Sequence, residues 1–131
     1  MSQLIKTETL KLIKAYKQHK TIIVGLDFDD TIFPLTKTSR VQDRCGDVLG
    51  LIIEIKDLIT ICLYSVGSNQ ELIYKEHIMD LRGIKPEYIN ESPVKIGNGG
   101  KPYFNILLDD KAGLNESIEI LKEFKNNINL K

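Results

Sequence analysis

Side chains that could do chemistry follow three separate apolar runs of the chain. They are Asp27 and Asp29 after residues 21–26, Ser65 after residues 59–64, and Asp109 and Asp110 after residues 103–108. Two carboxylates so close together repel each other unless a cation or a shared proton compensates. Magnesium compensates well, because it prefers oxygen ligands and also accepts phosphate oxygens. A solvated acidic turn would explain one such pair, but a second pair after another run favours a magnesium and phosphate site.

The segments between these runs have the spacing of amphipathic helices. Helices are predicted over residues 1–20, 41–55, 68–82 and 114–124, with a short extra strand over residues 87–90. Strands that alternate with helices predict an α/β fold, a three-layer Rossmann-like parallel sheet with helices on both faces, in a single domain of residues 1–131. In such sheets ligands bind beyond the carboxyl ends of the strands, so the three runs are expected to converge there.

The composition narrows the class of protein. Of the 131 residues 42% are hydrophobic, and lysine plus arginine equal aspartate plus glutamate at 18 each. This zero net charge argues against extended coating of nucleic acid. Basic residues that either flank the site or form an ordinary solvated face are Arg40, Arg44, Arg82, Lys85, Lys95 and Lys111. Two isolated cysteines, Cys45 and Cys62, and the lack of a signal or membrane-spanning stretch predict a cytoplasmic protein with reduced thiols.

Two other phosphate- or metal-binding patterns fail on specific residues. A calcium loop starting at Asp27 needs glycine at its sixth position and glutamate at its twelfth, where the chain has Ile32 and Thr38. A signalling receiver needs a lone aspartate at the end of a middle strand. Here the middle run ends at Ser65 with no aspartate.

Three segments carry a resemblance to a known family. Leu26-Asp-Phe-Asp-Asp-Thr31 resembles the first motif of the haloacid dehalogenase superfamily, in which two aspartates and a threonine at alternate positions follow a hydrophobic strand. Ser65 resembles the second motif and Ile106-Leu-Leu-Asp-Asp110 the fourth, in the family's order. The resemblance implies a magnesium-dependent phosphatase. The aspartate at position 29 favours phosphoester chemistry over the carbon–halogen chemistry of other members.

This resemblance also implies a role for each residue. Asp27 would be the nucleophile that forms an aspartyl-phosphate, and Asp29 the general acid and base. Magnesium would bind the Asp27 carboxylate, the Asp29 carbonyl and Asp109, with Asp110 joining or orienting these ligands. Phosphate contacts are expected from Ser65, Thr31 and the amides near Phe28 and Val66.

A lysine near the phosphate is also expected, because it would offset charge in the transition state. Lys101 and Lys95 both precede the third run. Lys101 is preferred, since Gly100-Lys-Pro102 leading directly into that run resembles capless bacterial and viral members of the superfamily. A solvated loop lysine is the alternative for either residue.

The intervals between the motifs are too short for the cap domain that many members carry. A flap over residues 32–38 is the one gate that the sequence offers, with Phe33 either its lid or ordinary core packing. An open site suits a bulky phosphorylated substrate such as a nucleotide, a nucleic-acid end, a phosphoprotein or a carrier-bound sugar phosphate, unless a second subunit supplies the lid. The competing function is a catalytically silent phosphate-binding or assembly module with the same fold.

Overall fold

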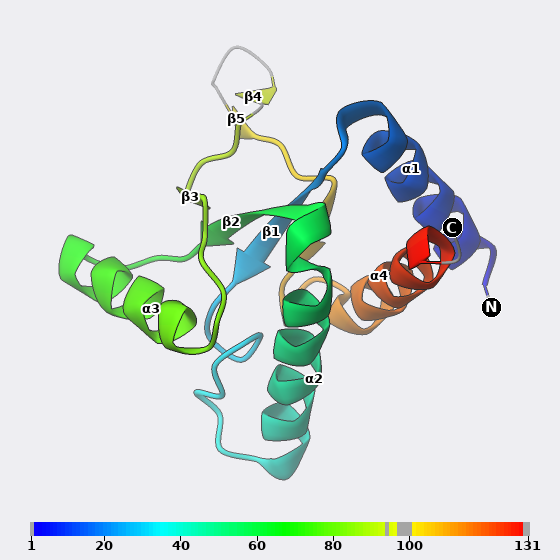
Figure 1. The fold of residues 1–131 in the computed structure, drawn as a ribbon. Coiled ribbons are helices and arrows are strands. Elements are labelled where there is room, and N and C mark those ends of the chain that lie inside the picture. Colours follow the sequence, from blue (N-terminus) through cyan, green and yellow to red (C-terminus); the bar gives the residue numbers. More distant parts are fainter. Residues whose placement is uncertain (1, 94, 97–100, 130–131) are drawn as a thin grey trace.

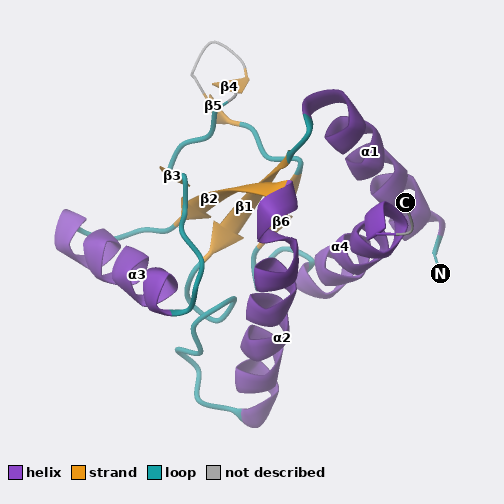
Figure 2. Cartoon of the chain, in the orientation of Figure 1, coloured by secondary structure: helices purple, strands orange, loops and turns teal. Residues whose placement is uncertain are grey.

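A computed structural model of the chain describes residues 2–93, 95–96 and 101–129. Its helices and strands, in chain order (Figures 1 and 2), are α1 (Gln3–His19), β1 (Ile22–Asp27), α2 (Ser39–Ile55), β2 (Ile59–Tyr64), α3 (Asn69–Leu81), β3 (Tyr88–Ile89), β4 (Lys95–Ile96), β5 (Lys101–Pro102), β6 (Ile106–Leu108) and α4 (Leu114–Asn129). A short 3-10 helix, Lys56–Leu58, joins α2 to β2. All predicted helices and strands are present, with shifted ends, and the short strand expected near residue 88 is β3.

The main sheet has four parallel strands in the order β3-β2-β1-β6. Along β1 every residue pairs with β2, so Asp27 lies opposite Tyr64. The chain passes from β1 outward to β2 and β3 and then returns to the other side of β1 as β6. The strand order therefore reverses beside β1, and ligands bind at such reversals, beyond the carboxyl ends of the strands. A separate antiparallel pair is formed by β4 and β5.

One face of the sheet carries the hydrophobic core. Side chains of a strand alternate between its two faces, so Val24 and Leu26 of β1 lie on the same face. Both are fully buried there. Buried apolar residues from all four helices join the same cluster, among them Leu12, Val48, Met79 and Phe124. In Figure 1, α2 crosses in front of the sheet, α3 lies to one side, and α1 lies with α4 to the other. The prediction of an α/β fold with a parallel sheet and packed helices is confirmed. The predicted third layer is wrong for the described residues, because the apolar residues of all four helices join the cluster on this one face.

Capping residues set where the helices begin. Thr38 accepts a hydrogen bond from the Val41 amide at the start of α2. At the start of α3, the Ser68 hydroxyl accepts from the Glu71 amide and the Glu71 carboxylate accepts from the Ser68 amide, which completes the predicted capping box. This cap begins α3 only a few residues after β2, so the second turn of the helix lies close to the end of that strand.

The other face of the sheet is covered near β1 by the loop before β6. Gly25 has no side chain, and a β-carbon there would lie 2.7 Å from the Phe104 ring. Phe104 therefore rests directly on the β1 backbone. Asn105 fixes this loop, since its amide donates to the Ile23 carbonyl and its side-chain oxygen accepts from the Ile23 amide. Ladder pairing of β6 with β1 begins only at Ile106, later than the sequence predicts.

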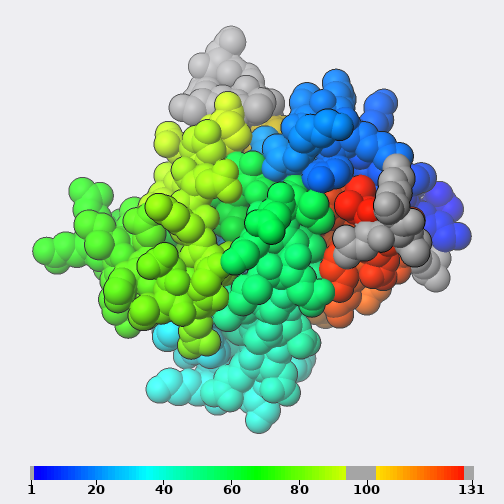
Figure 3. Space-filling model, viewed as in Figure 1, coloured from blue at the N-terminus to red at the C-terminus, as the bar shows by residue number. Residues whose placement is uncertain are grey.

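On the surface, α2 and α4 lie side by side (Figure 3), with an ion pair of 2.8 Å between Lys125 Nζ and Glu54 Oε2. No helix in the described part of the chain combines the length and the apolar character needed to cross a membrane.

Candidate active site

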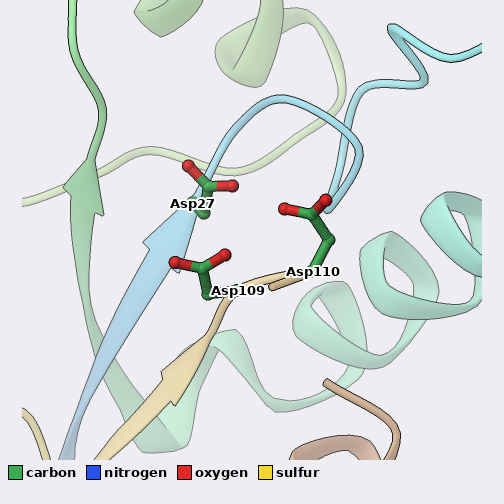
Figure 4. A group of neighbouring side chains, drawn as sticks. All are labelled: Asp27, Asp109 and Asp110. Carbon is green, nitrogen blue, oxygen red and sulfur yellow. The ribbon is translucent and has the colours of Figure 1, made fainter. Parts of the chain in front are cut away.

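Three carboxylates meet at the carboxyl edge of the sheet (Figure 4). Asp27 ends β1, and Asp109 and Asp110 follow β6. One oxygen of each carboxylate lies within 4.8 Å of those of the other two. The Lys111 amide donates to Asp109 Oδ1 at 3.0 Å and holds that side chain in place. The structure thus brings these three predicted residues together, and we call them the acidic half of the site.

The Asp27 carboxyl is half-buried among negative charges. Burial raises the pKa of Asp27, the charge of Asp109 raises it further, and contact with Asp110 adds to both, so that the pKa reaches about 6. A hydrogen bond from the Phe28 amide acts in the opposite direction. Because like charges cause part of this shift, a cation held between the carboxylates would favour the ionised form of Asp27.

Thr31 ties the two acidic segments to each other. Its side chain is fully buried. The Thr31 hydroxyl accepts from the Asp110 amide at 3.1 Å and donates to Asp27 Oδ2 at 3.4 Å. Both capacities of the hydroxyl are therefore used within the protein. Thr31 thereby positions the acidic half, and its predicted phosphate contact stays a prediction.

Ser65, which follows β2, is paired with a buried lysine from α3. Lys75 Nζ donates to Ser65 Oγ at 2.7 Å and to the Val66 carbonyl at 3.3 Å. It also lies 3.7 Å from Asp29 Oδ2 and 5.4 Å from the centre of the Phe28 ring. Lys75 is only 9% exposed, and lysines are rarely buried unless they are paired. We call Ser65 and Lys75 the serine–lysine half of the site.

The backbone of Ser65 is held by the next strand of the sheet. Asn90, directly after β3, accepts from the Ser65 amide through Oδ1 at 2.8 Å, and its own amide donates to the Leu63 carbonyl at 2.7 Å. Asn90 has a left-handed φ of 55°, a conformation that asparagine tolerates better than most residues. Two hydrogen bonds with Asn90 thus hold the end of β2 on the side of β3.

The backbone of Lys101, the predicted phosphate-binding lysine, lies outside the main sheet. It lies in β5, opposite Ile96 of β4, in the strand pair that also contains Lys95. The chain then reaches Asn105, which bonds to Ile23 near the start of β1. Because β6 runs parallel to β1, residues that precede β6 lie at the amino edge, away from Asp27 (Figure 1). The side chains of Lys95 and Lys101 lie outside the described part, so the predicted phosphate contact of either lysine stays a prediction, with the backbone of both in the strand pair β4-β5.

Lys75 is the lysine that the structure brings to the site, and the sequence analysis missed it. The sequence feature that could have identified Lys75 is its position on the apolar face of α3. Leu72, Lys75 and Met79 recur at spacings of three and four, which place them on one face of a helix. A lysine among the apolar residues of the buried face needs a partner in the interior, and the strand end at Ser65 supplies one.

A cavity of about 370 Å³ opens over the acidic half and Ser65. Its lining consists of five aspartates, one serine, one lysine and three apolar residues, namely Asp27, Asp29, Asp30, Asp109, Asp110, Ser65, Lys111, Leu35, Tyr64 and Val66. Val66 belongs to the predicted phosphate contacts and does line the cavity. Its carbonyl faces Lys75, as the hydrogen bond shows, and its side chain is 90% exposed.

The first two residues of the flap, Ile32 and Phe33, pack onto the core, and Leu35 further along it lines the cavity. The Phe33 ring stacks on the buried Phe28 ring, with centres 5.4 Å apart and planes 15° apart. The amide and hydroxyl of Thr36 each donate to the Asp30 carboxylate at 2.7 Å, and these bonds lower the pKa of Asp30. Core packing is therefore the correct interpretation of Phe33. Leu35 is the exposed flap residue at the cavity.

The acidic half fits a magnesium ion by the chemistry of its donors. Three carboxylates offer hard oxygen ligands within one another's reach, and their mutual repulsion is the condition that a divalent cation relieves. The Asp29 carboxylate instead faces Lys75 at 3.7 Å, and the metal contact expected from the Asp29 carbonyl stays a prediction.

Comparisons of the chain with protein-family models, with curated proteins and with solved structures give no match.

Proposed function

We propose that the protein is a magnesium-dependent phosphoester hydrolase of the haloacid dehalogenase type, with Asp27 as its nucleophile. The observation that carries the proposal is the meeting of the acidic half with the serine–lysine half at the ends of β1, β2 and β6. Transfer of a phosphoryl group requires a nucleophile that attacks the phosphorus. It also requires positive charge and hydrogen-bond donors that stabilise the phosphoryl oxygens. The cavity is lined by Asp27 and Ser65, and Lys75 supplies positive charge through its hydrogen bond to Ser65.

In this proposal Asp27 attacks the phosphorus, the bond to the leaving oxygen breaks, and the phosphoryl group is transferred to the Asp27 carboxylate. Asp29 gives a proton to the leaving oxygen and then takes one from the water that hydrolyses the aspartyl-phosphate. The Asp29 side chain is 45% exposed, so water reaches it, and its nearness to Lys75 orients it.

Ser65 and Lys75 hold the phosphoryl oxygens. Because Ser65 Oγ accepts from Lys75 Nζ, its own proton is directed away from the lysine and can be donated to a phosphoryl oxygen. Lys75 supplies positive charge from a buried position, where it is screened less than a surface lysine would be.

Asp27, Asp109 and Asp110 would hold the magnesium ion, with the Asp29 carbonyl as a further ligand. When bound, the ion would neutralise charge on the phosphoryl group and lower the repulsion between that group and the aspartates.

A silent phosphate-binding module is the competing function, and it predicts binding without turnover. The decisive experiment measures phosphate release from a panel of nucleotides, 3′-phosphorylated DNA and p-nitrophenyl phosphate, with magnesium or with a chelator. We expect magnesium-dependent release that Asp27→Asn abolishes and that Asp47→Asn, an exposed aspartate on α2, leaves intact. Turnover that survives Asp27→Asn would contradict the role of Asp27, and no turnover on any ester would favour the binding module.

A further inference from the structure

Tyr64 lies directly beside the proposed nucleophile. It is the last residue of β2 and pairs in register with Asp27, the last residue of β1. Partners in register on parallel strands point to the same face of the sheet, and neighbouring strands are about 4.8 Å apart. Tyr64 lines the cavity and is 47% exposed, although it belongs to an inner strand of the sheet. An aromatic ring so exposed, next to a phosphate site, is placed to contact the rest of a substrate.

The Tyr64 ring is held in position by a second ring. Phe104 meets it edge to face, with centres 6.1 Å apart and planes 74° apart. Phe104 is in turn fixed on the sheet, because Gly25 leaves room for it against the β1 backbone. The contact lowers the conformational entropy that Tyr64 would lose on binding a flat group. Leu35 and Val66 add exposed apolar surface to the same cavity.

The charges around the cavity limit how many phosphates the substrate can carry. Five aspartates line the cavity, and among the described lining residues only Lys111 adds positive charge. One magnesium ion with Lys75 offsets a single phosphoryl group, whereas further phosphates would meet the remaining carboxylates. The groove between α2 and α4 offers no basic track either, since Arg40, Arg44 and Lys122 alternate there with Asp43, Asp47 and Glu119. A nucleic-acid strand requires such a track along its backbone.

We propose that the substrate is a nucleoside monophosphate whose base stacks on Tyr64. This inference rests on the proposed function and names the substrate class of the same site. A cavity of about 370 Å³ is within the usual range for small-molecule sites. The phosphate occupies the space between the two halves of the site, and the base lies over the exposed aromatic ring one strand away.

The test compares adenosine 5′-monophosphate with ribose 5-phosphate, which differ only by the base. We expect kcat/KM with magnesium to be about tenfold higher for the nucleotide, mainly through KM, since stacking on an aromatic ring contributes about this much. Tyr64→Ala should remove this ratio and Tyr64→Phe should keep it. Tyr74→Ala, an exposed tyrosine on α3, is the matched control and should leave the ratio unchanged. Adenosine triphosphate should be a poorer substrate than the monophosphate.

Binding to Asp27→Asn protein with magnesium, measured by calorimetry, separates the two proposals. Tyr64-dependent preference for the nucleotide without hydrolysis by the wild-type protein would overturn the phosphatase and support base recognition. Equal hydrolysis of both esters, or equal losses on both in Tyr64→Ala, would overturn base recognition and keep the phosphatase. Neither binding nor hydrolysis of either ester would overturn both.

Discussion

The two halves of the site differ in how well the protein itself satisfies their charges. In the serine–lysine half, Lys75 has three oxygen neighbours, from Ser65, Val66 and Asp29. In the acidic half, like charges face one another, and the pKa of Asp27 rises to about 6. One half is thus preorganised for an anion, whereas the other is incomplete without a cation. A phosphate and a divalent metal bound together, as the proposed function requires, would complete both halves.

The largest effect is expected for Asp27→Asn. An amide cannot attack phosphorus, so kcat with p-nitrophenyl phosphate should fall by about a thousandfold or more. The metal-free variant should nevertheless melt at a higher temperature than the wild type, because it lacks the repulsion with Asp109 and Asp110. A loss of activity together with a higher metal-free melting temperature would support the view that the acidic half is unfavourable without a cation. A lower melting temperature would argue that Asp27 is stabilising as it stands.

Lys75→Met tests the serine–lysine half. Loss of a charged donor from the phosphoryl group should lower kcat/KM by about a hundredfold, as loss of similar transition-state contacts does. The control is Lys125→Met, which breaks the ion pair with Glu54 between α4 and α2, outside the cavity lining, and should leave activity unchanged. Equal activity of the two variants would contradict the proposed role of Lys75 in binding the phosphoryl group. Circular dichroism checks that Lys75→Met, which leaves a buried Ser65, still folds.

Magnesium should stabilise the folded protein through the acidic half. At a free concentration one hundred times its Kd, an ion that binds only the native state adds about 2.7 kcal/mol to the free energy of unfolding. Thermal denaturation with magnesium or with a chelator measures this gain. The gain should be much smaller in Asp109→Asn and unchanged in Asp47→Asn. An equal gain in both variants would place the ion elsewhere.

The smallest predicted effect is a pH dependence of the metal-free protein. The pKa of Asp27 is raised on folding from 3.8 to about 6, so its proton is held more tightly in the native state. The resulting stability is present below pH 3.8 and is lost as the pH rises to about 6 and beyond, by about 1–2 kcal/mol after solvent screening. Chemical denaturation of wild type and Asp27→Asn across this range should show the loss only in the wild type. Parallel curves would contradict the raised pKa.

The sequence predicts the acidic half far better than the lysine that completes the site. Asp27, Asp109 and Ser65 each follow a buried strand, and parallel strands deliver the residues after them to one edge of a sheet. The same rule places the backbone of residues before a strand at the opposite edge, which is where the backbone of Lys101 precedes β6. Lys75 comes from the second turn of a helix, so its position depends on how α3 packs on β2.

Two further details depend on packing that no local pattern specifies. The Phe33 ring lies on Phe28 because the turn after β1 folds back on itself, with hydrogen bonds from the Ile32 and Phe33 amides to the Phe28 carbonyl. Phe104 lies on β1 because Gly25 leaves space there. Neither contact follows from a periodic pattern in the sequence, so the residues that border the cavity could be identified only from the structure.

The most direct test of the central claim is detection of the phosphoryl group on Asp27. Acid quenching during turnover, followed by mass spectrometry of peptides, should find one phosphoryl group on the peptide that contains Asp27, assigned to that residue by fragmentation. Asp29→Asn should increase its amount, because the general base that speeds its hydrolysis is gone. A phosphoryl group on another residue, or turnover with none on Asp27 in either protein, would contradict the account.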